Sequence, residues 1–169
     1  EVVNRCNLNC IMCPQDRLTR PIGVMDFDLF KRIVDDVATN SPKETALWMA
    51  IMGETLILGD QAIKYIKYAA DSGIASTNLN TNLSGAGERL CRDLVATGVG
   101  KIIVGLDACT RKTYEKIRRG GDFDRVMANI DTICKAKEEA GLEKPELVIQ
   151  FIVQKENEHE VELLEPMFK

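Results

Sequence analysis

Histidine is almost absent from the sequence, and neither sign of charge dominates it. The only histidine, His159, lies in a charged segment near the C-terminal end, so hydrolytic mechanisms that depend on a histidine general base lack a candidate. The formal net charge is −4 and the pI is about 5.2, which gives no basic surface for nucleic acid or for an anionic membrane. No apolar run approaches the roughly 20 residues that span a membrane, and no signal peptide is visible.

Hydrophobic residues make up 45% of the 169 positions, which is enough for one soluble domain with its own core. No linker or shift in composition divides the chain. It begins at Glu1, without a methionine and inside an apparent strand. We therefore expect a single domain over residues 1–169, with sequence missing upstream.

Three of the six cysteines, Cys6, Cys10 and Cys13, fall within one short segment. Gaps of three and then two residues let one loop turn the three sulfurs toward a single centre, as in cluster-binding sequences. Such crowding indicates reduced, metal-binding cysteines rather than a disulfide framework, and so a cytoplasmic protein. An iron–sulfur cluster held by three cysteines leaves one iron open, whereas zinc, the alternative, needs a fourth ligand in a closed site.

The other three cysteines are expected to be structural. Cys91 and Cys134 lie in predicted helices beside apolar residues, where a free cysteine is usually a small buried hydrophobe. Cys109 follows a predicted strand and could reach the same edge of the sheet as the cluster, but a structural role is favoured for it as well.

Apolar strands and amphipathic helices alternate strictly along the chain. Parallel strands need helical crossovers, so this alternation predicts an α/β fold, with about five βα units if Val2 and Val3 end a first strand. An open doubly wound sheet and a partial β/α barrel share this pattern, but no glycine-rich dinucleotide turn favours the open sheet. The expected strands are 47–51, 74–79, 101–106 and 147–153, and the expected helices begin at Asp26, Asp60, Glu88, Asp122 and His159.

Polar residues follow the predicted strands. In a β/α barrel the chemistry belongs to the loops after the strand ends, so these residues are candidates for a binding site. Ordinary turns, helix caps and surface charges explain many such residues equally well. The candidates are Gly53 and Glu54, Asn80 and Asn82, Asp107, Arg118, and Gln150 with Gln154 on the same side of the last strand.

The cysteine segment, Cys-x3-Cys-x2-Cys directly after a strand, resembles the signature of the radical S-adenosylmethionine (SAM) enzymes. Met52-Gly53-Glu54-Thr55 resembles the family's Gly-Gly-Glu-Pro segment, although Met52 and Thr55 depart from it. Asn80-Thr81-Asn82 is similar to its Thr-Asn-Gly segment, and Tyr114 to Gly120 to its Tyr-x-x-Ile-Arg-x-Gly segment. The family has a partial β/α barrel of typically six strands, so this resemblance implies that about one unit is missing at the C-terminal end.

The resemblance also implies cofactors. Cys6, Cys10 and Cys13 would hold a four-iron, four-sulfur (4Fe-4S) cluster, and the open iron would chelate SAM. Glu54 and the backbone at Gly53 would receive the SAM ammonium, and the Arg118 guanidinium would suit its carboxylate.

The remaining contacts to SAM are also implied by the resemblance. Met12 would lie near adenine, Asn80 and Asn82 would face the ribose or methionine group, and Asp107 would meet ribose or substrate. Gln150 is a candidate for contact with cofactor or substrate by its position on the last strand alone. The family often carries serine where Gly105 stands, so a hydroxyl contact to the ribose is not expected here.

By the same resemblance, the chain is the core of an enzyme that cleaves SAM reductively. The resulting 5'-deoxyadenosyl radical takes hydrogen from a substrate. The segment from Cys13 to Asp26 resembles the branch with SPASM or twitch extensions, whose substrates are peptides, proteins or small natural products. The implied partners are such a substrate and a reductant such as flavodoxin or ferredoxin. The alternatives are a non-catalytic or electron-transfer iron–sulfur module and a zinc-stabilised binding domain.

Overall fold

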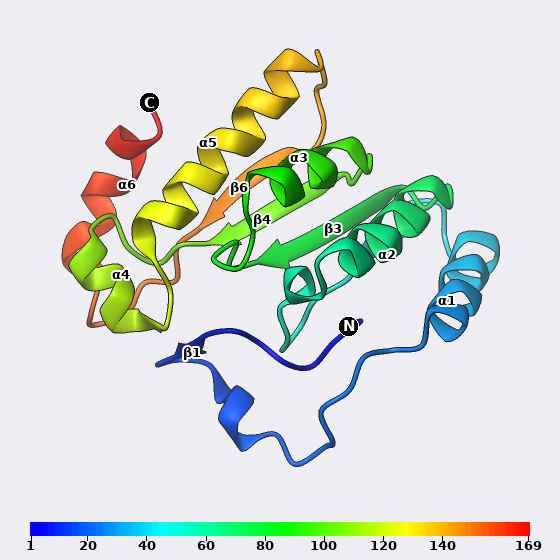
Figure 1. The fold of residues 1–169 in the computed structure, drawn as a ribbon, viewed down its shortest axis with the longest axis horizontal. Coiled ribbons are helices and arrows are strands. Elements are labelled where there is room, and N and C mark those ends of the chain that lie inside the picture. The colour runs from blue at the N-terminus through cyan, green and yellow to red at the C-terminus, as the bar shows by residue number, and fades with distance from the viewer.

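A parallel four-stranded sheet forms the centre of the computed structural model, which describes residues Glu1–Lys169. Its strand order is β2-β3-β4-β6, so the neighbouring strands are joined by crossovers. Helices α2, α3 and α5 lie side by side along one face of the sheet (Figure 1). The four strands are β2 (Ala46–Trp48), β3 (Ser76–Thr81), β4 (Lys101–Gly105) and β6 (Glu146–Gln150).

The five expected helices begin at or close to the predicted residues, and one further short helix, α4, was not expected. The Asp26 side chain accepts hydrogen bonds from Asp28 N and Leu29 N, and Asp122 accepts one from Arg125 N. Such caps satisfy backbone N–H groups that have no partner within the helix. The helices are α1 (Phe27–Asn40), α2 (Asp60–Asp71), α3 (Glu88–Ala96), α4 (Arg111–Ile117), α5 (Phe123–Glu139) and α6 (Val161–Met167, with Pro166 inside), and short 3-10 helices span Pro14–Arg17, Thr55–Leu58 and Glu158–Glu160.

The expected first strand at Val2 and Val3 is absent from the sheet. Val2 N donates to Met49 O at 3.4 Å, but Met25 N donates to Val2 O and Val3 forms an isolated antiparallel bridge with Val24. The backbone groups of this segment are thus shared between the sheet and the loop that follows the cysteines. The parallel sheet therefore has four strands rather than the expected five.

Two further features of the strands were not predicted. The strand expected at 47–51 is the edge strand β2, and its Trp48 is 49% exposed. A small antiparallel ladder was not expected at all: β1 (Asn9–Cys10) pairs with β5 (Arg118–Arg119). This ladder joins the cysteine segment to the turn that follows α4, near the end of the sheet toward which its strands point (Figure 1).

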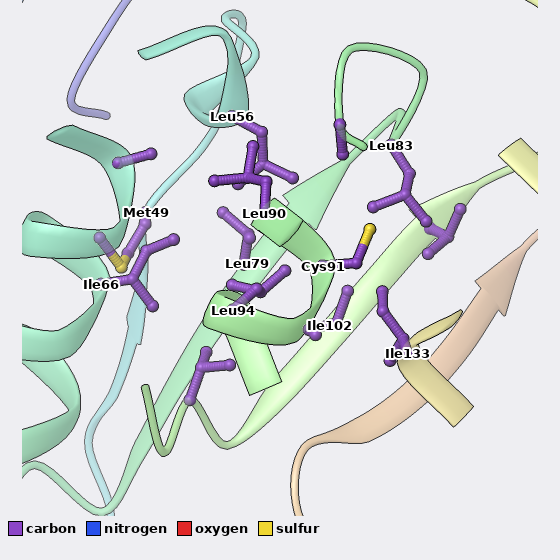
Figure 2. Packing of buried hydrophobic residues seen from close by; sticks show 14 of the residues in the cluster. Met49, Leu56, Ile66, Leu79, Leu83, Leu90, Cys91, Leu94, Ile102 and Ile133 are labelled. Carbon is purple, nitrogen blue, oxygen red and sulfur yellow. The ribbon is translucent and has the colours of Figure 1, made fainter. Parts of the chain in front are cut away.

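One hydrophobic cluster fills the space between sheet and helices. Leu79 of β3 and Ile102 of β4 pack against Leu90 and Leu94 of α3 (Figure 2). Cys91 also lies in this cluster, as expected, and burial raises the pKa of its thiol to about 11. Cys134 does not, since its side chain is exposed on α5. No helix is long and apolar enough to cross a bilayer.

Gly53 allows the N-terminal segment to cross the turn after β2 at very close range. A Cβ atom at this position would overlap the carbonyl oxygen of Val3, lie 2.7 Å from its carbonyl carbon, and lie 3.1 Å from Arg5 O. The next residue secures the crossing, because Glu54 N donates to Arg5 O at 2.9 Å. The backbone just before Cys6 is therefore placed by a residue without a side chain.

Replacing Gly53 by alanine should destabilise the fold by about 1–3 kcal/mol, because a backbone segment rather than a flexible side chain must move. Chemical denaturation would measure the change. Gly23→Ala is the matched control, since nothing lies within 4 Å of its added Cβ. Equal stability of the two variants would show that the crossing is not constrained at Gly53.

Candidate functional site

A cavity of about 310 Å³ opens at the carboxyl ends of the strands. All the cysteine and strand-end candidates from the sequence line it, except Asp107 and Gln154. They come from the cysteine segment, the ends of β2, β3, β4 and β6, and the β5 turn. The lining residues are Cys6, Cys10, Met12, Cys13, Pro14, Ala50, Ile51, Met52, Gly53, Glu54, Asn80, Thr81, Asn82, Ile103, Gly105, Arg118, Gln150 and Ile152.

The three cysteines are free thiols at one wall of this cavity, each partly buried. The loop is closed by a hydrogen bond from Cys13 N to Cys10 O at 3.1 Å, and Cys10 pairs with Arg118 in the β1–β5 ladder. Burial raises the pKa of Cys6 and of Cys10, and the nearby Arg118 guanidinium opposes the shift at Cys10. No three His, Cys, Asp or Glu side chains converge as ligands of a single metal ion would.

Glu54 is a buried carboxylate rather than a solvated one, with 3% of its surface exposed. One oxygen accepts from Leu56 N at 3.0 Å and from Thr81 Oγ1 at 2.9 Å, and the other accepts from Asn82 N at 2.6 Å. Burial raises the pKa of Glu54, and these three hydrogen bonds oppose the shift. A carboxylate has about four acceptor positions, so roughly one remains for a ligand in the cavity.

The side chains of Asn80, in β3, and Asn82, just after it, differ in their hydrogen bonding. Asn82 is engaged: its Nδ2 lies 3.0 Å from Asn7 Oδ1 and 3.5 Å from Cys6 Sγ, and its Oδ1 accepts from Ser84 N. Asn80 lines the cavity with a buried Oδ1 that has no hydrogen-bond partner in the protein. A buried polar atom without a partner is costly, so this oxygen marks a position where a ligand donor fits.

Arg118 and Asp107 form a buried ion pair at the end of β4. The distance from Arg118 Nη2 to Asp107 Oδ2 is 2.7 Å, and the other Asp107 oxygen accepts from Ile152 N at 2.8 Å. Asp107 is fully buried and does not line the cavity, which is the opposite of the ligand contact expected for it. Arg118 does line the cavity, and its Nε is buried without a partner.

The remaining candidates are placed as follows. Met12 is partly buried and Gln150 is exposed, and both line the cavity. Gln154 lies beyond the end of β6, so the even spacing from Gln150 does not bring it to the same side of a strand. Asn157, in the segment after β6, binds the backbone instead of the cavity: its Nδ2 donates to Asp107 O at 2.8 Å and to Ile152 O at 2.9 Å.

Cys109 lies away from the cavity. Its backbone N–H and that of Thr110 donate to the buried Glu160 carboxylate at 2.6 and 3.2 Å. Ile103 and Ile152 were not singled out from the sequence although they line the cavity. Ile103 lies within β4 and Ile152 just beyond β6, so an apolar residue at either place gave no signal for a site.

A family model of the Radical SAM superfamily matches residues 1–165, so the chain belongs to this superfamily of enzymes. Members of the superfamily use a 4Fe-4S cluster and SAM. The expectation drawn from the cysteine segment and the strand-end residues is therefore confirmed at the level of the family.

Two curated relatives are similar along most of the chain. A tungsten-containing aldehyde ferredoxin oxidoreductase cofactor-modifying protein of Pyrococcus furiosus is 27% identical over 158 residues, which are 93% of this chain and 43% of that protein. A GTP 3',8-cyclase of Saccharophagus degradans is 27% identical over 140 residues, which are 80% of this chain and 40% of that protein. The chain thus spans less than half the length of these relatives.

Solved structures share the fold. Native anSMEcpe with bound AdoMet, which is SAM, matches 99% of this chain and 46% of its own length with a TM-score of 0.78 at 17% identity. BtrN in complex with AdoMet and 2-DOIA matches 88% of this chain and 53% of its own length with a TM-score of 0.65 at 20% identity. At these identities the likeness concerns the fold alone.

Replacing Glu54 by glutamine should cost about 1–3 kcal/mol of stability, the usual penalty for one buried backbone N–H left without an acceptor. An amide presents only one acceptor oxygen, so it cannot receive both Leu56 N and Asn82 N. Chemical denaturation near neutral pH would measure the loss. Glu143→Gln, at an exposed position, is the matched control, and equal losses in the two variants would contradict a structural role for Glu54.

Proposed function

We propose that this chain is the catalytic core of a radical SAM enzyme in which Cys6, Cys10 and Cys13 hold a 4Fe-4S cluster beside a SAM molecule. The observation that carries the proposal is the cavity at the strand ends. This cavity is lined by three free thiols of one loop and by two residues with unpartnered polar atoms, Asn80 of β3 and Arg118 of β5.

The residues fit the cluster. Soft thiolate ligands suit iron–sulfur clusters, and three of them line one wall of the cavity. The ligands of a cluster bind different irons, so their sulfurs need not converge on one point as around a single ion. Asn82 supports the wall, because its Nδ2 lies within 3.5 Å of Cys6 Sγ. A hydrogen bond to a ligating sulfur favours the thiolate form.

The residues also fit SAM. When bound, the two groups together supply the reductive cleavage of SAM to a 5'-deoxyadenosyl radical. Arg118 offers its unpartnered Nε and remaining N–H groups to the SAM carboxylate, a charge-assisted contact. Glu54 offers its remaining acceptor position, and the backbone at Gly53 its carbonyl oxygen, to the ammonium group.

The other lining residues orient the nucleoside. Asn80 Oδ1 accepts from a hydroxyl or amino group of the ligand, and Met12 packs against adenine. Asn82 and Gln150 line the same cavity. Asp107 serves the site indirectly, through Arg118.

The cavity wall is partly apolar, with Ala50, Ile51, Ile103 and Ile152 among its lining residues. Such a wall excludes water from a reactive radical. Hydrogen-atom abstraction needs no general base, so the lack of histidine is no obstacle.

The substrate we propose is a peptide or a small natural product, and the electron donor is a flavodoxin or ferredoxin. The relatives' names cover cofactor modification and GTP cyclisation, and one neighbouring structure contains a peptide. Because these different substrates go with a shared core, we assign substrate recognition to parts of the protein outside residues 1–169. We propose that residues 1–169 form the core domain of a cytoplasmic enzyme and that the four-stranded sheet is part of a larger partial barrel.

Replacing Cys6, Cys10 or Cys13 by alanine should abolish cluster binding, because three thiolates define the site and no fourth cysteine or histidine lines the cavity. Iron content and the visible spectrum of anaerobically reconstituted protein would report the loss. Cys134→Ala is the matched control, since this thiol is exposed and remote from the cavity, and it should retain the cluster. A full cluster in any of the three variants, or a zinc-loaded protein without a visible spectrum, would refute the assignment.

The full-length protein, loaded with its cluster and given a strong one-electron reductant, should release methionine and 5'-deoxyadenosine, slowly without substrate and faster with it. Deuterium at the abstraction site of the substrate should appear in the 5'-deoxyadenosine, as mass spectrometry would show. A cluster-replete protein that neither binds SAM nor releases 5'-deoxyadenosine would instead be an electron carrier.

A further inference from the structure

The Arg118 guanidinium occupies the space that a side chain at position 105 would fill. A Cβ atom built on Gly105 would overlap Arg118 Nη2, lie 3.0 Å from Cζ and lie 3.2 Å from Nη1. The guanidinium therefore rests directly on the backbone at the end of β4. Even the smallest side chain at this position would displace it.

Asp107 holds the guanidinium in this place and is itself tightly held. Its two carboxylate oxygens bind Arg118 Nη2 and Ile152 N, and its carbonyl oxygen accepts from Asn157 Nδ2. Its backbone has a φ of 57°, a left-handed conformation that aspartate tolerates better than most residues. This conformation turns the chain at the end of β4.

Arg118 is also fixed through its backbone. Arg118 pairs with Cys10 in the β1–β5 ladder, and the Arg118 side chain is only 10% exposed. Since the backbone is held by the ladder, the guanidinium cannot step aside without weakening its buried ion pair with Asp107. Arg118 nevertheless lines the cavity, and its buried Nε has no hydrogen-bond partner.

We propose that Gly105 and Asp107 are positioning residues that fix the Arg118 guanidinium against β4 and so determine the affinity for SAM. The proposal rests on the proposed function, in which Arg118 contacts the SAM carboxylate. A hydroxyl side chain at position 105, although it adds a polar group to the cavity wall, should weaken SAM binding, because the guanidinium must leave its place.

The test compares SAM binding in full-length, cluster-loaded protein. Calorimetry would give the affinity for the wild type, Gly105→Ser, Arg118→Gln and the double variant, and the SAM-induced change in the EPR signal of the reduced cluster gives an independent signature. Each single change should weaken binding about ten- to hundredfold, the effect of one charge-assisted hydrogen bond. The double variant should bind no more weakly than Arg118→Gln alone, since both changes remove the same contact.

Two controls separate this effect from damage to the fold. Gly23→Ser adds the same side chain where nothing lies within 4 Å, and it should bind SAM as the wild type does. Thermal unfolding and iron content without SAM would show whether each variant is intact. If Gly105→Ser does not fold, Asp107→Asn releases the guanidinium without adding atoms at position 105. Its loss of affinity should likewise vanish in the Arg118→Gln background.

Wild-type affinity in a folded Gly105→Ser variant, or losses that add in the double variant, would overturn the positioning role while leaving the proposed function intact. A cluster-loaded wild type that binds no SAM would overturn the proposed function and this inference with it. An affinity that falls only when Arg118 is present supports both.

Discussion

The buried carboxylate of Glu54 connects the segments that make up the cavity. It lies in the turn after β2 and receives hydrogen bonds from that turn and from the end of β3. The same turn holds the N-terminal segment through Glu54 N, and Asn82, the neighbour of Thr81, reaches the cysteine loop. Because an ionised group is costly to bury without donors, this arrangement ties three distant parts of the chain into one geometry.

Local signals in the sequence predicted much of the fold. Asp26 and Asp122 were expected to begin helices and do so through side-chain caps, and the position of β4 follows from its apolar run Ile102–Val104. Helical spacing alone does not decide between the neighbouring Ile33 and Val34 for the buried face of α1, whereas the structure buries Val34 and leaves Ile33 40% exposed. These features depend on a few neighbouring residues, which is why sequence alone could indicate them.

The features that could not be predicted involve partners far apart in the sequence. Nothing near Asp107 indicates that its carboxylate binds Arg118 instead of a ligand, and nothing near Gly53 indicates that Val3 crosses it. The absence of serine at position 105 appeared as a weakness of the family resemblance, whereas the structure explains it by the guanidinium that lies there. Register and crossing geometry, rather than residue type, determine these contacts.

The ladder between the cysteine loop and the β5 turn comprises only two residue pairs, Asn9 with Arg119 and Cys10 with Arg118. A ladder this short near the surface opens at far lower free energy than the sheet, whose strands carry the buried Leu79 and Ile102. The loop can therefore lift away while the hydrophobic core stays closed.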